Sequence, residues 1–291
     1  MPKKATFALD IAAAVLATVA VLPQITGIAA HEWLGLVALV AFLLHLAASL
    51  NALSSLLKAA RFGSALAVAR IVLDAALFIA IAVCIVSGVL ISATAWELAA
   101  FSFRHPTHEL ARAITSGEWF DAACEIGDAL GVILPENFGK GLPSPSSSIE
   151  KVDEDGFFHR LRAEATRLFM GPGEPACSPY EGVWRAKAEG VKPLLFVNPH
   201  SVEVERFVKD HGFTRPEGTN EPLDHVATEC ELLQAFAMRA MTDSGSSEAY
   251  VQFLEEHLRV WIDDFCAECQ NVTSEPFYKA AAIYLETIAK Y

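Results

Sequence analysis

Positive charge is scarce in this chain. Lysine and arginine together number 22 against 35 aspartates and glutamates, which leaves a formal net charge of −13. Nucleic-acid binding depends on a basic surface, so this balance argues against a nucleic-acid partner. An acidic surface suits a cationic partner, although it also serves simply to keep a protein soluble.

Signatures of the common catalytic sites are missing as well. The sequence has no G-x-x-x-x-G-K-[ST] phosphate loop, no G-x-G-x-x-G turn, no G-x-S-x-G nucleophile elbow and no H-E-x-x-H metal motif. His105 and His108 have helical spacing, but no third metal ligand is close to them in the sequence. We therefore expect a protein that is not an enzyme.

The six cysteines, at positions 84, 124, 177, 230, 266 and 269, follow no disulfide framework. Cys266 and Cys269 form a C-x-x-C pair, but this pair is solitary and lies in helical sequence. A structural zinc site needs four ligands, so this solitary pair does not predict one. We expect reduced thiols packed in the core.

Charge is unevenly distributed along the chain. Residues 1–95 contain five basic and three acidic residues, whereas the remainder contains 17 and 32. Three apolar stretches, about 7–30, 34–56 and 69–93, are each long enough to cross roughly 30 Å of hydrocarbon. We predict a transmembrane domain over residues 1–93 and a second domain over residues 94–291. A cleaved signal peptide is the alternative for the first stretch.

Two histidines lie in or beside the apolar domain. The segments His31-Glu32-Trp33-Leu34-Gly35 and His45 to Asn51 resemble small cytochrome-b-like membrane domains. His31 and His45 are about 21 Å apart along a helix, so they cannot share one haem, although two stacked haems could each take one. The resemblance implies a fourth span that is missing here. Binding of haem b by a truncated domain and a bare membrane anchor both stay open.

The remainder of the sequence predicts helices. Apolar residues recur at three- and four-residue steps without strand-like alternation, which indicates an all-α fold. We expect helices at about 106–114, 117–131, 154–170, 201–211, 223–242, 247–269 and 276–290. Gly171-Pro172-Gly173 is expected to end the helix over 154–170.

The stretch from Glu221 to Glu229, with sequence EPLDHVATE, is the most informative. Pro222 suits the first turn of a helix, which places Glu221 and Asp224 near the positive end of the helix dipole. His225 and Glu229 are four positions apart and can pair. Helix capping with a surface pair is the simplest interpretation.

This stretch resembles the E-P-x-D-H signature of the TorD-type chaperones, which mature molybdenum-containing redox enzymes. LFMGPG at 168–173, PYEGVW at 179–184, and FLEEHLRVW at 253–261 followed by PFY at 276–278 resemble other stretches of that family in the same order. Gly182 and Trp184 replace the usual serine and tyrosine. The resemblance covers about residues 94–291 and implies an all-helical chaperone domain without a cofactor.

The resemblance also implies a partner, namely the precursor of a molybdopterin oxidoreductase with its twin-arginine signal peptide. The chaperone would hold this precursor back from export until its cofactor is inserted. An acidic, helix-lined groove would bind the two guanidinium groups and the apolar stretch after them. We expect six residues to form the peptide site. Asp224 and His225 are expected to contact the peptide directly. Glu221 and Glu229 would add charge or orient His225. Tyr180 and Trp184 would form aromatic walls, although core packing would explain these two residues equally well.

The expected location is the bacterial cytoplasmic membrane. Lys3-Lys4 and the basic loop from Lys58 to Arg70 favour the cytoplasm, and three spans would then place residue 94 outside. A chaperone for cytoplasmic precursors must face inward, so we expect a first stretch that does not span. Two alternatives are a haem-binding electron-transfer subunit with a docking domain, and a fusion without function. A homodimer stays open.

Overall fold

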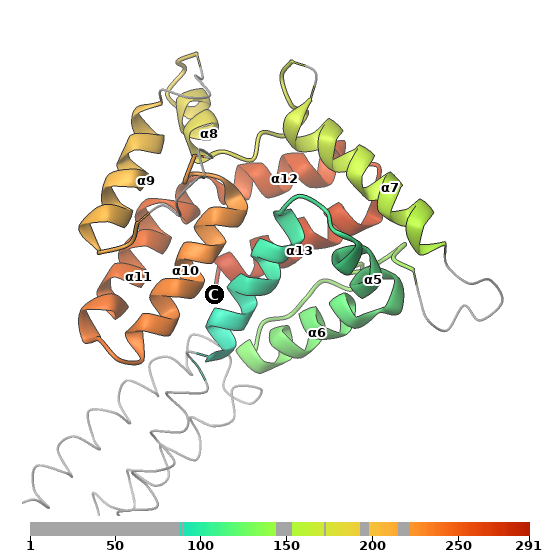
Figure 1. Cartoon of the computed structure of the whole chain (residues 1–291), viewed down its shortest axis with the longest axis horizontal. Helices are drawn as coiled ribbons and strands as arrows, with labels where there is room; N and C mark the ends of the chain where they lie inside the picture. The colour runs from blue at the N-terminus through green and yellow to red at the C-terminus, as the bar shows by residue number, and fades with distance from the viewer. Residues whose placement is uncertain (1–87, 89, 144–152, 172, 193–197, 215–221) are drawn as a thin grey trace, which may run out of the picture. The chain divides into compact units, whose positions relative to one another are not determined.

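The computed structural model describes residues 88, 90–143, 153–171, 173–192, 198–214 and 222–291 (Figure 1). The chain divides into two compact units, Met1–Gly88 and Val89–Tyr291, and the second is described here. His31, His45, Glu221 and nearly all of the three predicted spans lie outside the described residues. None of the described helices combines the length and the apolar character that crossing a bilayer requires.

The described part is all-helical, as predicted, and its one pairing of extended residues is an antiparallel bridge between Tyr180 and His225. A helix over residues 90–103 comes first. The elements that follow are α5 (His108–Ser116), α6 (Glu118–Leu130), α7 (Glu154–Ala165) with a π-helical turn η1 (Thr166–Met170), α8 (Glu181–Ala188), α9 (Pro199–Asp210), α10 (Val226–Ala240), α11 (Ser244–Glu256), a 3-10 turn η2 (Leu258–Val260), α12 (Ile262–Val272) and α13 (Pro276–Ala289).

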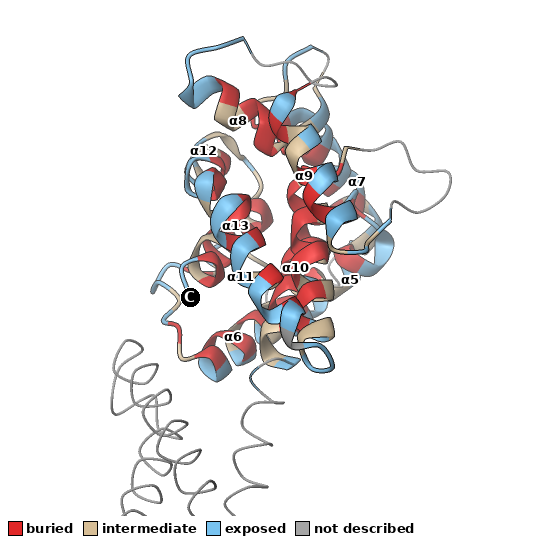
Figure 2. Ribbon diagram, turned by 90° about the vertical axis from the view of Figure 1, so that its left-hand side faces the viewer, coloured by how far each residue is buried: buried red, intermediate tan, exposed pale blue. Residues whose placement is uncertain are grey.

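Helix α13 lies at the centre of the hydrophobic core. Ten of its 14 residues are buried, and Figure 2 shows buried residues along α13 and α10. Trp119 of α6 packs edge-on against Phe277 and Tyr284 of α13, with ring centroids 5.1 and 6.2 Å apart. Trp119 Nε1 donates to Ser102 Oγ at 2.9 Å, so its polar atom is satisfied inside the core. These contacts join α6 and the helix over 90–103 to α13.

Helix α10 begins later than predicted. The prediction that Pro222 lies in the first turn of this helix is wrong. Leu223 and Asp224 form a turn, and His225 is the N-cap residue, with φ −77° and ψ 136°. His225 is held extended by its bridge to Tyr180, so helical dihedral angles start only at Val226. Asp224 therefore lies in the turn before the helix, not within it.

The single helix predicted over 247–269 is interrupted. Helix α11 ends at Glu256 and α12 begins at Ile262, with the 3-10 turn between them. His257 and Trp261 flank this turn with non-ideal dihedral angles (φ −115°, ψ −78° and φ −138°, ψ −16°). Neither glycine nor proline marks the interruption, which is why the sequence pattern does not signal it.

The five described cysteines are free thiols, and four of them are buried. Burial raises the pKa of Cys230 and of Cys266 well above the ordinary thiol value, which keeps both in the unreactive thiol form. Among the described residues, no three His, Cys, Asp or Glu side chains are grouped in a way that could hold a metal ion.

Candidate functional site

A groove of about 550 Å³ opens beside the N-terminus of α10. Four segments that are distant in sequence surround it, namely residues 103–106, the end of α7 with η1, Pro179–Tyr180, and residues 223–231. Its apolar members include Phe103, Phe169, Met170 and Leu223. Its polar members are Arg104, His105, Tyr180, His225, Thr228 and Glu231. An apolar groove with a few polar groups is the usual form of a site that binds a peptide or ligand.

Backbone hydrogen bonds hold two of these segments together. Val226 N donates to Pro179 O at 2.8 Å, and Glu181 N donates to Asp224 O at 2.9 Å. The antiparallel bridge between Tyr180 and His225 lies between these two bonds. Pro179–Tyr180 and Leu223–His225, which belong to two stretches that the sequence singled out separately, thus meet at one wall of the groove.

His225 presents a neutral imidazole to the groove. Its Nδ1 accepts a hydrogen bond from Ala227 N at 3.1 Å, which caps α10 and leaves the proton on Nε2. Burial lowers the pKa of His225 to about 4. The helix dipole also disfavours a cation at this end. The ring stands edge-on to Tyr180, with centroids 5.3 Å apart.

Asp224 lies beneath the groove and is not among its lining residues. Its side chain is 1% exposed, and Oδ2 accepts from Ser201 Oγ at 2.6 Å and from Gly182 N at 3.1 Å. Burial raises the pKa of this carboxyl above its ordinary value. Asp224 therefore links α8, α9 and the turn before α10, and acts on the groove through their positions.

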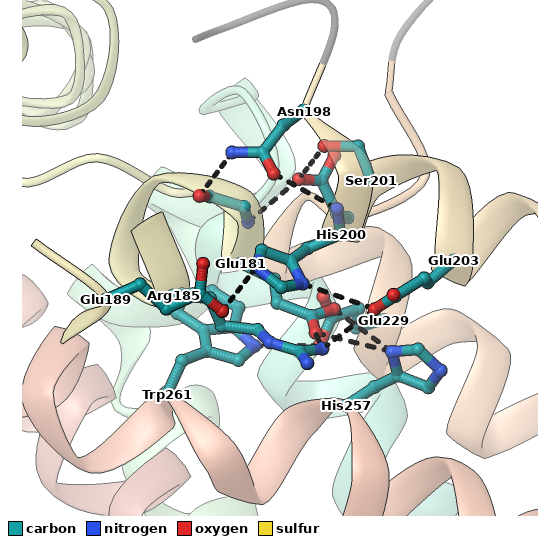
Figure 3. Close-up of polar contacts among 12 residues, drawn as sticks. Glu181, Arg185, Glu189, Asn198, His200, Ser201, Glu203, Glu229, His257 and Trp261 are labelled. Carbon is teal, nitrogen blue, oxygen red and sulfur yellow. Dashed lines mark hydrogen bonds and ion pairs between the residues drawn. The ribbon is translucent and has the colours of Figure 1, made fainter. Parts of the chain in front are cut away.

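The glycine at position 182 follows from the same packing. A Cβ on Gly182 would lie 2.8 Å from the side chain of Asn198 and 2.9 Å from Ser201 Oγ. Asn198 Nδ2 also donates to the Gly182 carbonyl (Figure 3). The space that a serine at 182 would fill is occupied by two residues of the α9 N-terminus.

Two further carboxyl groups are fully buried behind Asp224. Glu181 accepts from Arg185 Nη1 at 2.7 Å and from His257 Nδ1 at 3.2 Å, while Glu229 Oε2 accepts from Trp261 Nε1 at 3.1 Å (Figure 3). Burial, followed by the charges of Glu181 and Asp224, raises the pKa of Glu229 well above its ordinary value. The raised pKa favours the neutral acid form of Glu229, and its other oxygen, Oε1, is buried without a hydrogen-bond partner.

The six predicted site residues fall into distinct places. Tyr180 and His225 line the groove, whereas Asp224 and Glu229 are buried below it and Glu221 is outside the described residues. Glu229 bonds to Trp261 and His225 to Ala227, so the pairing expected from their i, i+4 spacing is not formed.

Trp184 packs away from the groove. Its Nε1 donates to Ser178 O at 2.7 Å, and its ring lies edge-on to Phe265 and beneath Lys187. Trp184 therefore packs against the core, which was the alternative to its role as an aromatic wall.

Arg104, Met170 and Glu231 are groove residues that were not among the six predicted site residues. Ala227, Thr228 and Glu231 lie on one face of α10. This helical spacing could have placed Glu231 beside the predicted site. Met170 lies inside the LFMGPG stretch and is 63% exposed. Nothing in the sequence connects Arg104 with this site.

Comparison with known proteins gives concordant results for the C-terminal part. Residues 135–267 match the family described as nitrate reductase delta subunit. The chaperone protein TorD of Shewanella piezotolerans is 26% identical over 149 residues, covering 50% of this chain and 66% of the relative. The chaperone protein TorD of Vibrio cholerae (El Tor) is 27% identical over 128 residues, covering 42% and 56%. The chain thus spans less than two thirds of the length of these relatives.

Among solved structures, a proposed redox enzyme maturation protein from Archaeoglobus fulgidus is 19% identical, with a TM-score of 0.37, covering 66% of this chain and 91% of that one. The sequence matches support a TorD-type chaperone domain in the C-terminal half of the chain, and they indicate that this domain is not an enzyme.

Proposed function

We propose that residues 94–291 form a chaperone domain that binds the precursor of a molybdopterin oxidoreductase and assists cofactor insertion before export. The groove at the α10 N-terminus binds the precursor's twin-arginine signal peptide. The observation that carries the proposal is the meeting of Pro179–Tyr180 with Leu223–His225 at one wall of this groove, within the region similar to TorD chaperones.

The composition of the groove suits such a peptide. Phe103, Phe169 and Leu223 offer apolar contact to the hydrophobic stretch of a signal peptide. His225 is neutral at pH 7, so it does not repel a guanidinium group, and its Nε2–H is a donor for a peptide carbonyl. The acidic balance of residues beyond 95 favours approach of a cationic segment.

The test is binding of a labelled synthetic peptide, in which two arginines precede a leucine-rich run, to the full-length protein by fluorescence anisotropy. His225→Asn keeps an N-cap residue while removing the imidazole. Tyr180→Ala removes the aromatic wall. We expect each to weaken binding at least about tenfold, which corresponds to roughly 1.4 kcal/mol.

The matched control is His159→Asn, because His159 is an exposed histidine on α7 that does not line the groove. Asp224→Asn should weaken binding less than His225→Asn if Asp224 only positions the wall. Unchanged affinity in both Tyr180→Ala and His225→Asn, with circular dichroism intact, would show that the peptide binds elsewhere.

A second part of the proposal concerns location. The three apolar stretches before residue 94 would tether the domain to the bacterial cytoplasmic membrane, with the domain on the cytoplasmic side. A green fluorescent reporter fused after Tyr291 is expected to be bright, and alkaline phosphatase at the same position inactive, because the client precursors are cytoplasmic. The reverse pattern would rule out a chaperone role for the full-length chain.

A further inference from the structure

The groove contains an ion pair made by the chain itself. Arg104 follows the helix over 90–103, and its Nε donates to Oε1 of Glu231 on α10 at 2.5 Å. Both residues line the groove, and their side chains are 55% and 37% exposed. A basic residue of the protein therefore already occupies an acidic group at the place where a cationic peptide would bind.

Glu231 is the carboxylate at this end of α10 that an incoming cation can reach. Asp224 is 1% exposed and Glu229 is fully buried, and both already accept hydrogen bonds from the protein. His225, the neighbouring titratable group in the groove, is neutral because burial lowers its pKa to about 4. A guanidinium group entering the groove therefore meets Glu231 as its accessible counter-charge.

We propose that Glu231 selects arginine in the bound peptide and that Arg104 occupies this carboxylate until the peptide arrives. This inference rests on the proposed function. It adds that the same groove is specific for arginine and that one of its own arginines pairs with Glu231 in the free protein. Arg104 uses its Nε and one oxygen of Glu231. An incoming guanidinium can present two nitrogens to both oxygens of the carboxylate, which lysine cannot do.

Displacement of Arg104 requires little free energy, because exposed ion pairs contribute weakly to stability. Met170 lies in the same groove and is 63% exposed. Its flexible thioether side chain adapts to apolar residues of different shape, which suits the variable segment after an arginine pair. The groove thus combines strict selection at Glu231 with permissive apolar contact at Met170.

The experiment compares three labelled peptides that differ only in their basic pair, Arg-Arg, Lys-Lys or Ala-Ala before the same leucine-rich run, on the full-length protein. Arg104→Gln frees Glu231 and is expected to tighten Arg-Arg binding by about two- to fivefold. Glu231→Gln is expected to weaken it at least about tenfold and to abolish the preference for Arg-Arg over Lys-Lys. Arg112→Gln is the matched control, because Arg112 forms an exposed ion pair with Glu154 and does not line the groove.

The possible outcomes separate this inference from the proposed function. If the wild type binds the peptide but Arg104→Gln behaves like Arg112→Gln, or Glu231→Gln keeps its preference for arginine, the inference is wrong and the chaperone proposal stands. If the wild type binds Arg-Arg no better than Ala-Ala, both are overturned. Tightening by Arg104→Gln together with loss of selectivity in Glu231→Gln supports the inference.

Discussion

Replacing Arg185 with methionine is expected to lower the free energy of unfolding by about 3 kcal/mol. Glu181 is fully buried, and Arg185 Nη1 bonds its Oε1 at 2.7 Å. Removal of one partner leaves a buried carboxylate without its main counter-charge, which costs more than the pair itself contributes. His257 would then be the remaining basic partner of Glu181, and it carries charge only when protonated. Urea denaturation at pH 7, followed by circular dichroism, measures the change.

The double variant Arg185→Met with Glu181→Gln separates the loss of the pair from the loss of packing. A neutral amide needs no counter-charge, so the double variant should regain more than half of the lost stability. Arg112→Gln is a suitable control for removing an arginine from an exposed pair, with an expected effect below about 0.5 kcal/mol. Equal destabilisation by the single and double variants would contradict this explanation.

Glu229→Gln is expected to make the protein less sensitive to alkaline pH. Burial raises the pKa of Glu229 in the folded state above its value of about 4.3 in the unfolded chain. A raised pKa means that the contribution of this group to stability is fully present below about pH 4 and is lost as pH rises through the folded pKa. Glutamine mimics the neutral acid, because its oxygen can accept from Trp261 Nε1 and its amide carries no charge at any of these pH values.

The measurement is the free energy of unfolding at pH 5 and pH 8 for both proteins. The wild type should lose about 1.4 kcal/mol more than Glu229→Gln for each pH unit between the unfolded and the folded pKa of Glu229. Glu125→Gln, an exposed substitution on α6, should follow the wild type at both pH values. Parallel curves for wild type and Glu229→Gln would show that Glu229 is ionised in the folded protein.

Helices α6 and α13 were well predicted from apolar spacing alone, whereas α8 lies outside every predicted helical range. The expected range 117–131 is one residue longer than α6 at both ends, and the expected range 276–290 is one residue longer than α13 at its C-terminal end. The failures have local causes. His225 is held extended by Tyr180, which delays the start of α10, and the region around His257 and Trp261 breaks without a glycine or proline. Tertiary hydrogen bonds decide both places, and periodicity carries no information about them.

The site was predictable to the extent that its residues are contiguous. Tyr180 and His225 belong to two recognisable stretches and meet in the groove as part of one wall. The sequence could not show that Asp224 faces inward, because a turn residue and a first-turn residue of a helix look alike in sequence. Arg104 and Glu231 pair across 127 positions, and each is an ordinary surface charge when considered singly.

The groove is assembled from segments that are far apart in the sequence, which has a consequence for when it forms during folding. The link from Gly182 to Asp224 closes 42 positions, and the pair of Arg104 with Glu231 closes 127. Closing such loops costs chain entropy, with about 0.6 kcal/mol added for each doubling of length. Contacts of this kind form late, after local helices exist. Until α8 and α9 have docked and the wall has closed, the groove does not exist, so an incompletely folded molecule would lack the proposed peptide site.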